Sequence, residues 1–152
     1  MRLALVEPDI AGNVGTLIRL GACMGVPVDL IEPMGFPFGN RAMARAGMDY
    51  VEQASVTRHN DWESFAAVTT GRLVLLTTRG ATPLWQARFQ ADDVLLLGAE
   101  CSGAPPHVHD AAALRVAIPT QPGCRSLNVA VAGAMALGEA LRQTHPSIAP
   151  AR

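Results

Sequence analysis

Short apolar runs alternate along the chain with longer segments of mixed polarity. Five runs have the length and continuous apolarity of strands buried on both faces, at residues 3–6, 28–31, 73–78, 94–98 and 114–118. The segments between them predict helices at about 13–24, 40–47, 60–68 and 106–112, and a longer helix at about 126–143. This alternation favours an α/β fold with a mostly parallel sheet and helices on both faces.

The length of 152 residues fits one domain covering residues 1–152, with a tail that we expect to be flexible from about residue 146. The N-terminus reaches Glu7 and Pro8 too early for a signal peptide. The apolar stretch 129–137 is much shorter than the roughly 20 residues that cross a bilayer. We therefore expect no membrane partner.

All 12 basic residues are arginine, and the sequence contains no lysine. This composition excludes Schiff-base chemistry and the P-loop, both of which need the lysine amine. Arginine, in contrast, grips phosphate with a planar fork. The net charge of −1 neither favours nor excludes nucleic acid, because phosphate binding depends on clustered cations.

The cysteines and histidines point to a reduced compartment without a metal site. Cys23, Cys101 and Cys124 are odd in number and form no CxxC pair, which favours the cytoplasm over a disulfide framework. His107 and His109 lie in an isolated HVH with no second pair of ligands, so we expect no metal.

Three loops that follow strands are rich in glycine and polar groups: AGNVG, GAECSG and PTQPGCRSLN. Ligands of open parallel sheets bind beyond the carboxyl ends of the strands. In the first loop Asn13 is a suitable helix N-cap, and Gly15 and Arg19 lie four residues apart on one helix face. Gly15 could leave open space for a phosphate or ribose beside Arg19. Equally, they could be a turn glycine and a surface arginine.

The other two loops allow similar alternatives. Glu100, between Gly98 and Gly103, could accept hydrogen bonds from a ligand, hold an arginine or cap the next helix. Ser126 and Asn128 bring polar side chains to the start of a helix that we expect near Ser126, where free backbone N–H groups also lie. The small residues that follow also fit a buried C-terminal helix.

Taken together, the three loops resemble the signature motifs of the SPOUT superfamily of S-adenosylmethionine-dependent RNA 2'-O-ribose methyltransferases. Within it, IEPMGF at 31–36 and RAGMDY at 45–50 resemble the small family that methylates the tRNA wobble nucleotide. The resemblance implies a C-terminal deep trefoil knot, an obligate homodimer and S-adenosyl-L-methionine as cofactor. It also implies the anticodon stem-loop of tRNA as partner, with cytidine or a modified uridine at position 34 as target.

The resemblance also implies roles for individual residues. The catalytic residues would be Arg19, Asn13 and Glu100. The arginine has been cast as the base in such families, but our own hypothesis is that Arg19 holds a substrate phosphate and stabilises negative charge on the 2'-oxygen. The cofactor would contact Leu76, Thr77, Gly98, Ile118, Ser126 and Leu127, and the substrate Gly15, Arg41, Arg45 and Asn128. Arg58 and Arg79 are further candidates for phosphate contacts.

The sequence departs from that family at Thr16, Ser102, Ala130, Val131 and Gly138. The departures bear on tRNA choice, substrate contacts and dimer packing more than on the fold. Two other functions therefore stay open. One is a 2'-O-methyltransferase for another tRNA or rRNA site, and the other is a knotted RNA- or nucleotide-binding module without turnover.

Overall fold

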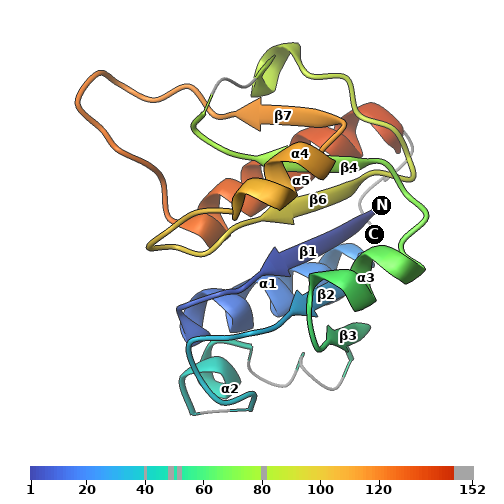
Figure 1. Ribbon diagram of the computed structural model, residues 1–152, viewed down its shortest axis with the longest axis vertical. Coiled ribbons are helices and arrows are strands. Elements are labelled where there is room, and N and C mark those ends of the chain that lie inside the picture. The colour runs from blue at the N-terminus through green and yellow to red at the C-terminus, as the bar shows by residue number, and fades with distance from the viewer. Residues whose placement is uncertain (40, 48–49, 51–52, 80–81, 146–152) are drawn as a thin grey trace, which may run out of the picture.

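The computed structural model describes residues 1–39, 41–47, 50, 53–79 and 82–145. Its strands form one sheet in the order β3-β2-β1-β6-β4-β7-β5, and neighbouring strands are parallel (Figure 1). The strands are β1 (Arg2–Val6), β2 (Val28–Ile31), β3 (Val56–His59), β4 (Leu73–Leu76), β5 (Thr82–Pro83), β6 (Val94–Leu97) and β7 (Leu114–Ala117). The predicted α/β fold with a parallel sheet is confirmed.

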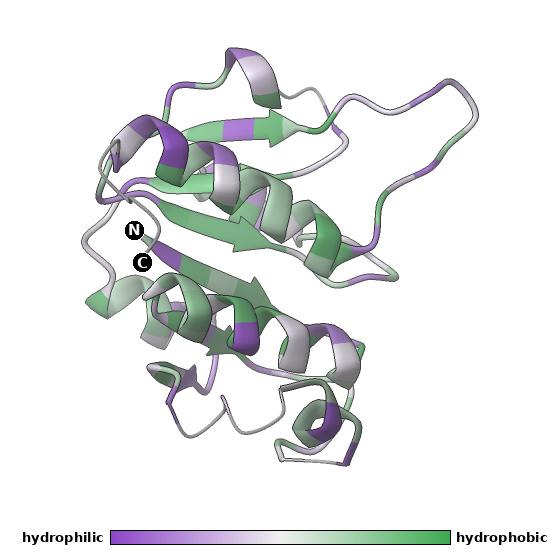
Figure 2. Cartoon of the chain, turned by 180° about the vertical axis from the view of Figure 1, so that it is seen from behind, coloured by the Kyte–Doolittle hydropathy of each residue, from purple (hydrophilic) through white to green (hydrophobic). Residues whose placement is uncertain are grey.

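Helices cover both faces of the sheet. They are α1 (Ala11–Met24), α2 (Arg41–Gly47), α3 (Trp62–Val68), α4 (Pro106–Ala111) and α5 (Val129–Thr144), with a short 3-10 helix η2 (Leu84–Gln86). Along β1, Leu3 and Leu5 pack in the core that α1 and α5 cover, whereas Ala4 and Val6 pack in the core that holds Phe65 of α3 and Val108 of α4. Figure 2 shows α1 and α5 on their shared face. Burial of alternate residues on opposite faces explains why the central strands are continuously apolar.

Two strands were not predicted. β3 is an edge strand whose Thr57 and Arg58 are exposed, so it lacks the continuous apolar run of a strand buried on both faces. β5 has two residues and ends on Pro83, which has no N–H to donate. Both lie at the two ends of the sheet, where burial constrains the sequence least.

The predicted starts of the two long helices were wrong. α1 begins at Ala11 with Ile10 as its N-cap and no capping side chain, so Asn13 lies inside the helix. α5 begins at Val129 rather than near Ser126, and the side chain of its N-cap Asn128 accepts from the N–H groups of Ala130 and Val131. These shifts free the Asn13 side chain for a contact outside its helix.

The described residues include no helix long and apolar enough to cross a membrane. The predicted flexible tail from about residue 146 lies outside the described residues.

Candidate functional site

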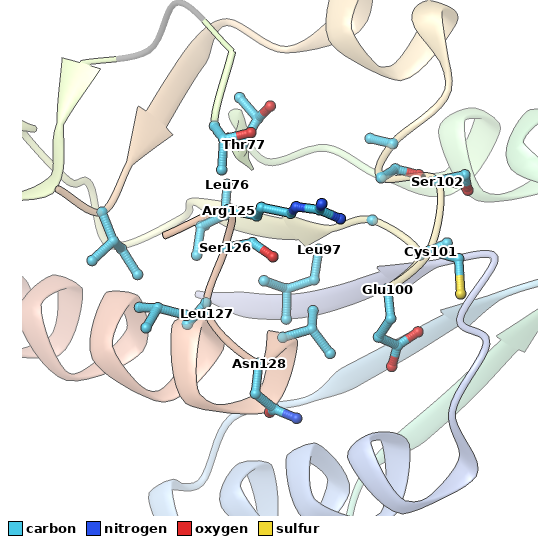
Figure 3. Close-up of a pocket in the computed structure, with 18 of the residues that line it drawn as sticks. Leu76, Thr77, Leu97, Glu100, Cys101, Ser102, Arg125, Ser126, Leu127 and Asn128 are labelled. Atoms are coloured by element: carbon cyan, nitrogen blue, oxygen red, sulfur yellow. Dashed lines mark hydrogen bonds between the residues drawn. The ribbon is translucent and has the colours of Figure 1, made fainter. Parts of the chain in front are cut away.

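A cavity of about 530 Å³ opens where the loops after β4, β6 and β7 meet the start of α1. This is the carboxyl edge of the parallel sheet, where ligands of such sheets bind. The volume falls within the usual 300–1,000 Å³ of small-molecule sites. Figure 3 shows side chains from several of these segments around it.

The residues around the cavity include all six for which cofactor contacts were predicted: Leu76, Thr77, Gly98, Ile118, Ser126 and Leu127. Leu97 and Val116 add to the apolar wall. The wall therefore combines apolar side chains with the backbone polar groups of three loops, a combination suited to a flat heterocycle with polar edges.

A relay of hydrogen bonds joins the start of α1 to the loops after β6 and β7 at one side of the cavity. The amide of Asn128 donates to Asn13 Oδ1 at 2.9 Å, and the amide of Asn13 donates to Glu100 Oε1 at 2.8 Å. The relay has a fixed direction, because Asn128 Oδ1 accepts from the first turn of α5 and leaves its NH₂ to donate. Segments more than 80 residues apart in sequence are tied together in this way.

Glu100 is also tied to the backbone of the first loop. Its Oε2 accepts from the Asp9 N–H at 2.8 Å, so each carboxylate oxygen has a donor. Asp9 in turn accepts from the Cys101 N–H at 3.1 Å. The side-chain hydrogen bond with Asp9, together with the charge of Asp9, raises the pKa of the Cys101 thiol. Cys101 therefore stays a thiol near neutral pH and is unsuited to act as a nucleophile.

Gly98 is required by the shape of its own loop. A Cβ there would lie against the Ala104 N–H and 2.6 Å from the carbonyl carbon of Gly103, because the loop folds back through an antiparallel bridge between Ala99 and Gly103. Gly103 has a φ of 74°, a backbone conformation that glycine adopts without steric cost. The GxExxG spacing thus builds the turn that presents Glu100.

Gly15 does not provide the open space that we expected beside Arg19. It is buried, and a Cβ there would lie against the Met43 carbonyl oxygen and 2.9 Å from the Cβ of Ala46 in α2. Gly15 instead allows α1 and α2 to pack closely. That expectation was wrong because the α1–α2 contact does not follow from spacing within one helix.

Three of the predicted arginines, Arg19, Arg41 and Arg45, lie outside the cavity wall of this chain. Arg19 is exposed on α1, with its guanidinium carbon 5.3 Å from the ring centroid of Tyr50. Arg41 and Arg45 are exposed on α2. In the described residues of one chain, the cavity and these cations are therefore separate surfaces.

Arg125 is a cavity residue that the sequence analysis did not single out. It precedes Ser126 in the long loop after β7, and its guanidinium reaches across the cavity (Figure 3). Arg79 and His109 also contribute to the wall. Arg125 lies within the polar loop PTQPGCRSLN, which the sequence analysis did identify. The direction of a loop side chain leaves no periodic pattern in the sequence, so the position of its guanidinium could not be predicted.

Among the described residues, no group of three or more His, Cys, Asp or Glu could hold a metal ion.

The SpoU rRNA Methylase family model matches residues 1–138 of this chain. The chain belongs to this family. A family relative from Beijerinckia indica, the tRNA (cytidine(34)-2'-O)-methyltransferase, is 53% identical over 144 residues, which cover 93% of this chain and 90% of the relative. The predicted resemblance to this family is confirmed.

Two solved structures extend the similarity to the fold. One, described as giving insights into the 2-OH methylation of C/U34 on tRNA, has a TM-score of 0.88 and 35% identity, covering 93% of this chain and 94% of that one. The other, an AdoMet-bound rRNA methyltransferase from Sinorhizobium meliloti, has a TM-score of 0.84 and 27% identity, covering 93% of this chain and 55% of that one. The fold of most of this chain therefore has a counterpart in these two structures.

Proposed function

We propose that this chain transfers a methyl group from S-adenosyl-L-methionine to the ribose 2'-hydroxyl of the wobble nucleotide, a cytidine or modified uridine at position 34 of tRNA. The observation that carries the proposal is that Asn128, Asn13 and Glu100 join the start of α1 to the loops after β6 and β7 beside one cavity. The relatives named for cytidine 34 support the choice of substrate, since the similarity covers nearly the whole chain.

The residues of the cavity fit the cofactor. Leu76, Leu97, Ile118 and Leu127 offer apolar surface for the adenine, and the loops offer backbone donors and acceptors for its polar edges. When bound, S-adenosyl-L-methionine supplies an electrophilic methyl group on its sulfonium. We assign cofactor contacts to the six predicted residues: Leu76, Thr77, Gly98, Ile118, Ser126 and Leu127.

The hydrogen-bond relay of Asn13, Glu100 and Asn128 fixes the start of α1 and the loops after β6 and β7 relative to one another. The acceptor ribose therefore approaches the cavity in one orientation. Both Glu100 oxygens already accept hydrogen bonds within the chain, which favours a positioning role over proton transfer. Arg19 holds a substrate phosphate and stabilises negative charge that develops on the 2'-oxygen. A guanidinium group offers hydrogen-bond donors but no acceptor, so we assign Arg19 no role as the base.

We propose further that the enzyme is a homodimer in which Arg19 serves the cavity of the partner. Ile10, Leu127 and Val131 are large apolar side chains exposed at or beside the cavity rim, at 47%, 39% and 49%. A second copy that covers them would also bring cations to the cavity. Arg41 and Arg45 would contact the phosphates of the anticodon stem-loop.

The remaining predictions of the resemblance belong to the same proposal. Residues 1–152 form one methyltransferase domain, and its C-terminal part is tied in a deep trefoil knot. The resemblance implies that this knot lies among the loops after β4, β6 and β7, which meet around the cavity. An enzyme that modifies tRNA is expected in the cytoplasm.

Mass spectrometry of nucleosides from tRNA of a deletion strain tests the substrate. We expect 2'-O-methylation at position 34 to disappear, and to return with the wild-type gene but not with Arg19→Ala. Arg19→Lys keeps the charge but loses the planar fork, so kcat should fall across the whole pH range. An unchanged rate in Arg19→Lys would argue against the bidentate role.

A second candidate is methylation of another RNA site, because the matching family is described as rRNA methylases. In that case, the deletion strain would keep methylation at position 34 and lose it in ribosomal RNA or elsewhere in tRNA. A module without turnover would instead bind S-adenosyl-L-methionine in calorimetry yet transfer no methyl group to total RNA.

A further inference from the structure

An exposed aromatic ring and an arginine form a pair on the surface outside the cavity. Phe38, in the loop after β2, is 38% exposed, and the guanidinium carbon of Arg58 on β3 lies 4.7 Å from the centroid of its ring. Arg58 Nε donates to Glu32 Oε1 at 3.1 Å, and its Nη2 donates to the same oxygen. Glu32 thus holds the guanidinium against the ring before any ligand arrives.

The pair is connected to the cavity through backbone contacts. The Gly35 N–H donates to the Pro8 carbonyl at 3.0 Å, and the next residue, Asp9, donates its N–H to Glu100. A Cβ at Gly35 would lie 3.1 Å from Asp9 Cα, so the loop that carries Phe38 packs directly on the first loop. Phe38 therefore lies on the same carboxyl edge of the sheet as the cavity.

The segment that follows the pair's loop is cationic, although Glu32 itself pairs with Arg58. Between Gly35 and Gly47 the sequence contains no acidic residue, and Arg41 and Arg45 are exposed on α2. A ring packed against a fixed guanidinium is held in place as a flat surface on which a nucleobase can stack, and nearby arginines can neutralise the phosphates that join bases. An acidic peptide could use the cations, but it has no need of the ring.

We propose that Phe38 and Arg58 form a stacking site for an unpaired nucleobase of the RNA, next to the nucleotide that enters the cavity. The inference rests on the proposed function, and it names the surface that selects a single-stranded loop over a duplex. Bases in a loop can be splayed out and stacked on aromatic and guanidinium planes, whereas paired bases cannot.

Steady-state methyl transfer to an anticodon stem-loop RNA tests the site. Stacking of one base on an aromatic ring corresponds to roughly 5- to 150-fold in affinity. We expect Phe38→Ala to raise KM for the RNA about tenfold, with kcat and the affinity for S-adenosyl-L-methionine unchanged. Phe38→Trp should stay within about twofold of wild type because it keeps a flat ring.

Trp85→Ala is the matched control. Trp85 is more exposed than Phe38, at 60%, but it lies on η2 directly after β5, and β5 and β3 form opposite ends of the sheet. Its replacement should leave KM for the RNA unchanged. The site is refuted if Phe38→Ala keeps the wild-type KM, or if Trp85→Ala weakens RNA binding equally.

A binding measurement separates this inference from the proposed function. A 2-aminopurine placed beside the target nucleotide of the stem-loop should lose fluorescence on binding to wild type, and lose less with Phe38→Ala. If wild type shows this quenching but transfers no methyl group, the proposed reaction fails and the stacking site stands. If wild type methylates the RNA while Phe38→Ala quenches fully, the stacking site fails alone.

Discussion

Glu100 illustrates how one residue acquires its role from segments distant in the sequence. From the sequence, a carboxylate between two glycines could bind a ligand, hold an arginine or cap a helix. In the structure its oxygens accept from the Asn13 amide and the Asp9 N–H, which is none of those three. The residue type was recognised correctly as important to a loop, but its partners were not, because they lie about 90 residues earlier.

Glu100→Gln should destabilise the protein and reduce methyl transfer. The new NH₂ group would face either the Asn13 amide or the Asp9 N–H, and both of these are donors. One partly buried donor would therefore lose its acceptor, at a cost of about 1–2 kcal/mol. For a chain of this size we expect a Tm lower by about 2–8 °C. Calorimetry with Glu63→Gln on α3 as the control measures this, since Glu63 is exposed and outside the relay. A Tm equal to that of the control would argue against the relay.

At the scale of elements, α1 and α2 pack on each other through Gly15. The sequence places Gly15 and Arg19 on one face of a helix, and the helix itself is confirmed. Which face meets α2 could not be read from spacing, because α2 is a separate helix that follows β2. The contact changes the interpretation of Gly15 from a ligand-facing gap to a packing position.

Gly15→Ala and Gly12→Ala should therefore have opposite effects, although both residues lie in α1. A Cβ at Gly15 meets α2 backbone, so Gly15→Ala should lower the free energy of unfolding by about 1–3 kcal/mol. A Cβ at Gly12 has nothing within 4 Å, so Gly12→Ala should gain up to about 1 kcal/mol from helix propensity. Urea denaturation of the two variants decides this. Equal effects would mean that helix propensity alone governs both positions.

At the scale of the whole molecule, the cavity and Arg19 lie on separate surfaces of one chain. The proposed homodimer brings them together by letting each Arg19 serve the partner's cavity. The sequence alone identified both Arg19 and the residues predicted to contact the cofactor in the cavity. Which subunit supplies each of them to one site depends on how two copies associate.

Mixed dimers test this arrangement. Arg19→Ala and the cavity-blocking Leu76→Trp should each be inactive alone. When equal amounts are refolded together, half of the dimers are mixed and each has one complete site, so activity should recover to about one quarter of wild type. Calorimetry with S-adenosyl-L-methionine checks that Leu76→Trp blocks the cavity and Arg19→Ala does not. No recovery in dimers shown to be mixed would place Arg19 and the cavity it serves in the same subunit.

The sequence by itself determined the α/β fold, the five inner strands and three of the segments around the cavity, namely the start of α1 and the loops after β6 and β7. It could do so because burial on both faces forces continuous apolar runs, and parallel strands bring the loops after them to one edge. Only the tertiary structure decided that Asn13 contacts Glu100, that Gly15 faces α2 and that Arg125 reaches into the cavity. Those facts depend on contacts between distant segments and on side-chain directions in loops, and neither leaves a periodic pattern along the chain.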